Sequence, residues 1–155
     1  MWTLVVFCCA SGPTSATAQV RRQGGRPDIT VGLRSGRDFE NHAWSLGLQA
    51  GLRIQDRLDF RPSGDYFLGD RTAFRWQLNA DLIQSFGPRR RGYAGGGAAF
   101  TRVRPLSSVK TGYNLFFGLV LAEPEVRRRL FLEFRWTFVN RTSPFRLVAG
   151  FSQPL

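Results

Sequence analysis

The chain has 155 residues, which suits one domain and leaves little room for a second. Its 17 glycines and its 14% share of aromatic residues favour sheet over helix, and its formal net charge of +11 fits nucleic acid or anionic lipid as a partner. Beyond residue 18, no apolar run approaches the roughly 18 residues that a membrane helix needs, which excludes a helical membrane protein.

Residues 1–18 are predicted to be a cleavable signal peptide. A nearly unbroken apolar run, Trp2–Ala10, is followed by an A-x-A site, so we expect cleavage after Ala18. No Lys or Arg precedes the run, which makes the segment atypical. Cys8 and Cys9 lie inside it, so the mature chain would hold no thiol; a lipoprotein acylated on one of them is the alternative.

After a flexible lead-in over residues 19–27, residues 28–155 alternate between apolar and polar positions with a period of two, which predicts strands. Five segments alternate clearly: 44–54, 74–82, 112–121, 130–139 and 145–152. Three weaker segments lie between them: 28–34, 57–61 and 93–103. Eight strands joined in chain order predict an all-β fold, an eight-stranded antiparallel up-and-down barrel.

The connections between the expected strands fall into two sets, one at each end of such a barrel. The odd-numbered connections are 35–43, 62–71, 104–109 and 140–144, and we call their end the loop end. The even-numbered connections are 55–56, 86–92 and 122–129, at the turn end. Longer loops at one end and short turns at the other are typical of outer-membrane barrels.

Alternation alone fits two barrels, a soluble lipocalin-like one with apolar residues inside and a transmembrane one with apolar residues outside. The polar face is rich in Gly, Ser and Asn, which suits a narrow interior. It also carries both signs of charge, which predicts an interior polar network of Arg53, Arg75, Asp81, Glu133 and Arg135. These features, with the export signal, favour the transmembrane barrel.

Aromatic residues near the strand ends are expected to form the girdles that mark membrane interfaces. The principal girdle positions are Trp44, Phe74, Tyr113, Trp136, Phe138 and Phe151. Phe60 and Phe145 are also expected at the loop end, and Phe86 and Tyr93 at the turn end.

The second half of the chain resembles a known family. The segments Tyr93–Phe100, Thr111–Leu119 and Leu130–Trp136 show a Gly-rich strand, a G-Y-N strand and an L-F-L-E-F-R-W strand in the order typical of the outer-membrane β-barrel domain family, which contains the small OmpA- and OmpX-type barrels. The resemblance implies the fold, a place in the bacterial outer membrane and delivery to the barrel-insertion machinery. The chain departs from the family where it continues past Phe151 to Leu155 instead of ending on an aromatic residue.

Few residues are candidates for chemistry. Glu133 and Arg135 share the inward face, where an ion or proton path is the alternative to a structural ion pair. His42 lies near Asp38, Glu40 and Ser45, a grouping that small lipid-A-modifying barrels use for catalysis, but no nucleophile motif surrounds it. We therefore expect no enzyme, and no metal or cofactor, because no ligand spacing is present.

The arginines of the loop end are expected to contact lipopolysaccharide phosphates; they are Arg37, Arg71, Arg104 and Arg141. Two triplets, 89–91 and 127–129, share the turn end, where solvated turns or inner-leaflet phosphates would account for them. A nucleic-acid partner is not expected in an exported protein. The sequence thus predicts a monomeric, non-enzymatic outer-membrane protein with a structural, envelope-integrity or surface-interaction role. A soluble exported barrel binding a small apolar ligand is the alternative.

Overall fold

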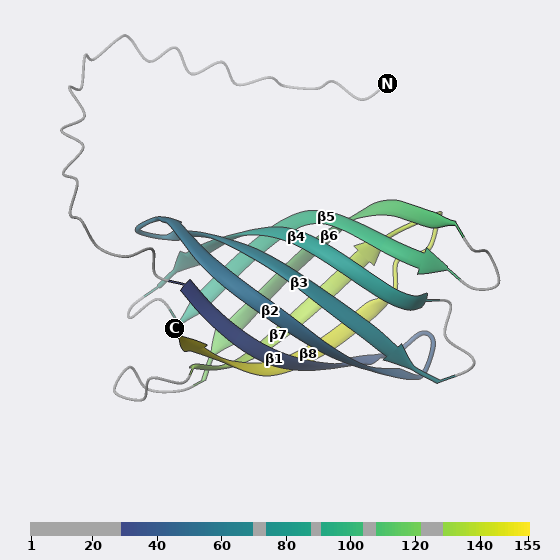
Figure 1. Cartoon of the computed structure of the whole chain (residues 1–155), viewed down its shortest axis with the longest axis horizontal. Helices are drawn as coiled ribbons and strands as arrows, with labels where there is room; N and C mark the ends of the chain where they lie inside the picture. Colours follow the sequence, from purple (N-terminus) through teal and green to yellow (C-terminus); the bar gives the residue numbers. More distant parts are fainter. Residues whose placement is uncertain (1–28, 70–73, 88–90, 104–107, 122–128) are drawn as a thin grey trace, which may run out of the picture.

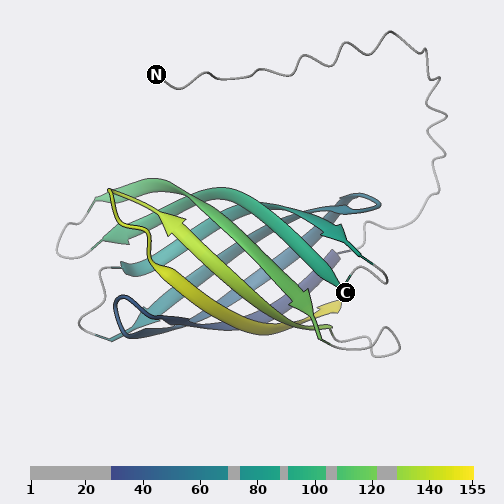
Figure 2. The same ribbon diagram turned by 180° about the vertical axis from the view of Figure 1, so that it is seen from behind.

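A computed structural model describes residues 29–69, 74–87, 91–103, 108–121 and 129–155. Its eight strands form one closed antiparallel barrel in chain order (Figures 1 and 2). They are β1 (Ile29–Asp38), β2 (Ala43–Gln55), β3 (Leu58–Leu68), β4 (Phe74–Phe86), β5 (Gly92–Val103), β6 (Val109–Val120), β7 (Arg129–Phe138) and β8 (Phe145–Pro154). The predicted eight-stranded transmembrane barrel is confirmed as the fold. The expected signal peptide and lead-in lie outside the described residues.

The barrel closes where β1 meets β8. Thr30 lies opposite Pro154 and Asp38 opposite Arg146, and the same nine-residue ladder binds the first strand to the last. Each strand therefore has a neighbour on both sides, which removes the exposed edges that make open sheets aggregate. In the described part of the chain, no helix is long and apolar enough to span a membrane.

The third strand corrects a predicted boundary. We expected a strand to end at Arg61 and a long loop to run from residue 62 to 71, because proline, glycine and aspartate follow one another there. Instead β3 continues to Leu68, with alternating burial along its length. Pro62, which has no N–H, lies opposite Ala80, and pairing with β2 resumes at Ser63. Turn-forming composition was a misleading signal inside this barrel.

The expected contrast between long loops and short turns is also wrong. Two residues join β2 to β3 at the turn end, but eight join β6 to β7 at the same end, against four between β1 and β2 at the loop end. Loop length therefore does not distinguish the two ends of the barrel.

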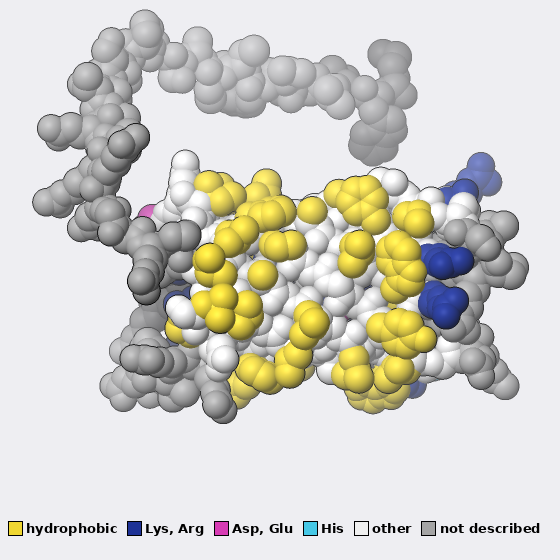
Figure 3. Space-filling view, viewed as in Figure 1, with side chains coloured by type: hydrophobic (Ala, Val, Ile, Leu, Met, Phe, Trp, Pro, Cys, Tyr) yellow, Lys and Arg dark blue, Asp and Glu magenta, His cyan; other side chains and the backbone are white. Residues whose placement is uncertain are grey.

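The two faces of the barrel wall differ sharply in polarity. Outward positions carry large apolar side chains that are about half exposed, among them Leu46, Leu48, Leu78, Leu115 and Leu119. Figure 3 shows apolar side chains over the flank of the barrel, with most of the visible Lys and Arg side chains at the loop end. Inward positions carry most of the buried charges. This is the reverse of a water-soluble barrel and is the arrangement that a lipid surrounding requires.

Glycine makes room for the large inward side chains. A Cβ atom at Gly118 would collide with the ring of Tyr93, and one at Gly97 would lie 2.7 Å from the carboxylate of Asp81. The Gly-rich stretch of β5, whose facing the sequence leaves ambiguous, therefore lines the interior with backbone. A narrow eight-stranded barrel can hold its bulky residues only beside such gaps.

Candidate functional site: the barrel interior and the loop end

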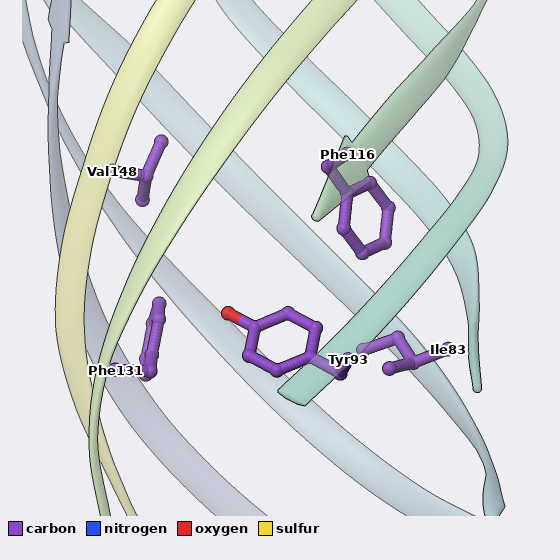
Figure 4. Packing of buried hydrophobic residues seen from close by; sticks show 5 residues of the cluster. All are labelled: Ile83, Tyr93, Phe116, Phe131 and Val148. Atoms are coloured by element: carbon purple, nitrogen blue, oxygen red, sulfur yellow. The ribbon is translucent and has the colours of Figure 1, made fainter. Parts of the chain in front are cut away.

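An apolar cluster fills the interior toward the turn end. Five consecutive strands, β4 to β8, each contribute one side chain, and Figure 4 shows them converging inside the barrel. The members of this interior apolar cluster are Ile83, Tyr93, Phe116, Phe131 and Val148. Tyr93 and Phe116 meet edge to face, with ring centroids 6.5 Å apart. Three aromatic rings and two aliphatic side chains thus occupy the interior toward the turn end.

Arg135 lies at the centre of a buried ion network. Its Nε donates to Glu133 Oε1 at 2.8 Å, and its Nη2 donates to Asp81 Oδ2 at 2.7 Å. Arg61 of β3 reaches across the barrel and forms an ion pair with the other oxygen of Glu133. Arg135, Glu133 and Asp81 are fully buried, so each charge depends on these partners for its solvation.

A second ion group centres on Asp65. Arg34 of β1 forms a two-point contact with it, with Nε donating to Oδ1 at 2.7 Å, and Arg146 of β8 approaches Oδ2 at 3.5 Å. Forked guanidinium–carboxylate contacts are the strongest of the charge-assisted hydrogen bonds. This group therefore connects β1, β3 and β8 across the seam where the barrel closes.

Amide and hydroxyl groups join the charges into one network. Gln77 Nε2 donates to Asn79 Oδ1 at 2.5 Å, Asn114 Nδ2 donates to the same oxygen at 2.8 Å, and Asn79 Nδ2 donates to Asp65 Oδ2 at 3.3 Å. Thr137 Oγ1 donates to Asn114 Oδ1 at 2.8 Å and accepts from Arg146 Nη2 at 2.9 Å. Five strands, β3, β4, β6, β7 and β8, thus share one hydrogen-bonded layer.

Arg61 joins the ion network to the interior apolar cluster. Its guanidinium carbon lies 5.5 Å from the ring centre of Tyr93, 5.0 Å from that of Phe116 and 5.8 Å from that of Phe131. The Tyr93 hydroxyl donates to Glu133 Oε2 at 3.2 Å. The cation is therefore held by one carboxylate and by the faces of three rings.

Asp81, Glu133 and Arg135, three of the five residues expected in the interior network, lie together at its centre. Arg53 lies apart near the turn end, 3.5 Å from Asp59 in a partly exposed pair. For Arg75 the expectation is wrong: its side chain is exposed, because it lies where β4 begins, at the register shift between Phe74 and Trp76 in the pairing of β4 with β5.

Four charged members of the network are not among the residues predicted from the sequence. They are Arg34, Arg61, Asp65 and Arg146. Each occupies an inward position of its strand, and extending the alternation of β1 and β3 would have placed the first three inside. Alternation predicts which way a charged side chain faces, but it does not predict its ion-pair partner, since Arg61 and Glu133 are 72 residues apart.

Several expected girdle residues lie on the outer wall. Tyr113 stacks on Phe138 with ring centres 4.7 Å apart, and Trp44 is exposed beside Arg37, whose guanidinium lies 5.2 Å from the ring centre. Trp136 packs at 5.0 Å against Phe145.

At the turn end, Phe151 lies opposite Leu33 and Leu130. Two assignments are wrong: Phe60, paired with Leu52 and Leu82, belongs to the turn end, and Tyr93 points inward. The side chain of Phe74 lies outside the described part of the chain.

The grouping around His42 does not form a triad-like arrangement. Asp38 accepts two hydrogen bonds from Asn41, each at 2.9 Å, and the Ser45 hydroxyl donates to the Gly36 carbonyl at 3.5 Å. His42 and Glu40 are exposed in the connection between β1 and β2. Among the described residues no group of three or more His, Cys, Asp or Glu is placed to hold a metal ion.

Two of the four arginines that were expected to contact lipopolysaccharide lie among the described residues. Arg37 is partly buried near the end of β1, and Arg141 is exposed in the turn between β7 and β8. Arg71 and Arg104 lie outside the described residues, as do most positions of the two arginine triplets.

Solved structures share this architecture. The N-terminal β-barrel domain of Pseudomonas aeruginosa OprF matches with a TM-score of 0.70 at 15% identity, covering 84% of this chain and 99% of that one. Neisserial surface protein A matches at 0.59 and 16%, covering 82% and 97%. The designed transmembrane barrel TMB2.3 matches at 0.60 and 16%, covering 86% and 98%.

No protein-family model matches the sequence, and no curated protein is significantly similar to it. At these identities the structural matches concern the fold. The chain has the fold of the small OmpA-type outer-membrane β-barrels.

Proposed function

We propose that this protein is a non-enzymatic structural barrel of the bacterial outer membrane, with a role in envelope integrity or surface interaction. The observation that carries the proposal is the inverted polarity of the wall, with leucines outside and paired arginines and carboxylates inside. A soluble lipocalin-like carrier needs the opposite arrangement, an apolar cavity inside and a polar surface. The interior of this barrel is filled by its ion network and the interior apolar cluster.

A structural role also follows from how the interior is packed. Arg135, Glu133 and Asp81 occupy the middle of the barrel with no measurable exposure of their side chains. An eight-stranded barrel filled with side chains offers no wide aqueous passage. The interior therefore supports a rigid scaffold rather than bulk transport.

We orient the turn end toward the periplasm. Both ends of the barrel domain, Ile29 and Pro154, lie at that end, so each of the four hairpins starts and finishes on the side from which an exported chain arrives. The loop end then meets the outer leaflet. There Arg37 and Arg141 would contact lipopolysaccharide phosphates, which guanidinium groups bind well.

Folding in detergent tests the membrane assignment. Residues 19–155, refolded in detergent, should migrate as a compact band that shifts only after boiling, and should precipitate when the detergent is removed. A protein that stays folded and soluble in plain buffer would contradict the proposal. On cell fractionation, the protein should follow an outer-membrane marker.

Single cysteines test the orientation, since the only two cysteines, Cys8 and Cys9, precede the barrel. Glu40→Cys at the loop end should react with an impermeant maleimide on intact cells, and Arg57→Cys at the turn end should react only after the outer membrane is opened. The reverse labelling pattern would show that the loop end faces the periplasm. It would contradict the proposed contact of Arg37 and Arg141 with lipopolysaccharide, but not the membrane barrel itself.

A further inference from the structure

A groove lies at the loop end where two hairpins reach different heights. β6 begins at Val109, but its pairing with β7 begins only at Tyr113, opposite Phe138. The hairpin of β7 and β8 ends lower, in the turn that follows Val139. The step leaves an open groove of about 350 Å³ on the outer surface. Its lining is Tyr113, Phe138, Val139, Asn140, Arg141, Thr142 and Ser143.

The wall of this groove is a tight turn with an unusual backbone. Val139 and Thr142 exchange two hydrogen bonds, of 3.0 and 2.9 Å, around the two-residue loop Asn140–Arg141. Both loop residues have positive φ, 50° and 66°, as a type I′ turn requires. Asparagine tolerates this conformation, but glycine is preferred where Arg141 stands. The chain therefore keeps an arginine at a position where its backbone is strained.

The groove combines three kinds of contact. The Tyr113–Phe138 stack supplies a flat aromatic floor, and Tyr113 is 54% exposed. Arg141 supplies a guanidinium, and the hairpin adds the amide of Asn140 and the hydroxyl of Ser143. The Thr142 hydroxyl donates to the Val139 carbonyl at 2.6 Å, so it can only accept a hydrogen bond from a ligand. A guanidinium selects phosphate, while amides and hydroxyls select the hydroxyl groups of a sugar.

An aromatic strip extends from the groove floor down the outer wall. Phe117 and Phe134 stack at 5.0 Å, Trp136 lies 5.9 Å from Phe117, and Phe145 lies 5.0 Å from Trp136. A free sugar phosphate would not use this strip, because it has no apolar part. A glycolipid would use both regions, with its headgroup in the groove and its acyl chains along the strip.

We propose that the groove of Tyr113, Phe138 and the 140–143 turn binds the phosphorylated sugar headgroup of an outer-leaflet glycolipid of the lipid A type. The proposal rests on the proposed function, because it needs the loop end in the outer leaflet. It goes further in naming one site and one chemistry, where the proposed function has only a general contact between loop arginines and phosphates.

The test uses the refolded barrel in detergent, with the temperature of its boiling-dependent gel shift as the readout, since a ligand of the folded state raises that temperature. Bisphosphorylated lipid A should raise it for the wild type. Dephosphorylated lipid A and soluble glucosamine phosphate should have much smaller effects, the first for lack of phosphate and the second for lack of acyl chains. Equal effects of phosphorylated and dephosphorylated lipid A would overturn the proposal.

Variants separate the groove from general attraction. Arg141→Asn should weaken lipid A binding about tenfold, the loss of one charge-assisted contact, while Arg57→Asn, the same change in a turn at the opposite end, should leave it unaltered. Arg141→Gly should weaken binding while raising the unfolding temperature in the absence of lipid, because glycine relieves the strain. If either Arg141 variant bound lipid A with wild-type affinity, the proposal that the groove is the binding site would be overturned. If Arg37→Asn lowers lipid A binding and neither Arg141 variant does, the proposed function stands and the groove is not the binding site.

Discussion

The barrel interior contains two regions built on opposite principles. In the ion network each buried charge is held by named partners at fixed distances, as Arg135 is by Glu133 and Asp81. In the interior apolar cluster, five side chains fill space without directional bonds. The comparison shows that stability in the first region depends on the pairing of opposite charges, whereas in the second it depends on the volume that the side chains fill. The two regions should therefore fail in different ways when one residue is replaced.

The largest effect is expected in the ion network. Arg135→Met leaves Asp81 and one oxygen of Glu133 buried without their partner, which should lower the free energy of unfolding by about 3–5 kcal/mol. Urea titration of the refolded protein in lipid vesicles measures it. Adding Asp81→Asn to the variant should recover part of the loss, because it removes a stranded charge. No recovery would mean that arginine acts here mainly by filling space.

A somewhat smaller loss is expected in the interior apolar cluster. Phe131→Ala removes a buried ring and its contact with Arg61, at a cost of about 3 kcal/mol in the same titration. Phe131→Leu, which stays apolar and leaves a smaller cavity than alanine, should cost about 1.5 kcal/mol. If leucine were as harmful as alanine, the contact with the Arg61 cation, and not volume, would control this region.

Overpacking should also destabilise the interior apolar cluster. In Gly118→Ala the new methyl group collides with Tyr93 and lies 2.7 Å from the Leu132 carbonyl oxygen, which should cost about 1–3 kcal/mol. Combining it with Tyr93→Leu tests the cause, because a smaller side chain admits the methyl group. The double variant should be more stable than the sum of the two single losses predicts, and simple additivity would contradict this explanation.

The smallest effect is expected for an ion pair outside the network. Arg53 and Asp59 lie 3.5 Å apart with side chains 31% and 29% exposed, so water solvates both. Arg53→Ala should change the free energy of unfolding by no more than about 0.5 kcal/mol. A loss approaching that of Arg135→Met would show that burial is not what separates the two pairs.

The fold could be predicted from the sequence to the extent that alternation survives in each strand. The alternation of β2 is unbroken, and its expected limits, residues 44 and 54, differ from the observed ones by one residue at each end. β3 was cut short because Pro62, Gly64 and Asp65 look like a loop, although in the barrel the aspartate is an inward ion-pair member. Proline, glycine and aspartate therefore predict a loop less reliably in a strand whose inward positions line a polar barrel interior.

The sequence predicted several residues of the interior ion network, but not which acid pairs with which arginine. Alternation places Asp81, Glu133 and Arg135 on the inward side, yet which acid meets which arginine depends on how the strands are staggered around the barrel. Arg61 of β3 meets Glu133 of β7 across the lumen, and Asp65 of β3 meets Arg146 of β8. Neither pair joins neighbouring strands. Stagger is a property of the closed barrel, and no local sequence pattern records it.

The placement of the ion pairs has a consequence for assembly. Three of them join the first four strands, taken here as one half of the barrel, to the last four: Arg61 with Glu133, Asp81 with Arg135, and Asp65 with Arg146. While the sheet is open, the acids and bases of each half lack these counterions, and lipid cannot solvate them. Arg34 with Asp65, and Glu133 with Arg135, can pair within one half, but Arg61, Asp81 and Arg146 gain their ion-pair partners only when the two halves come together. These three charges therefore favour completion of the barrel over a partly inserted sheet.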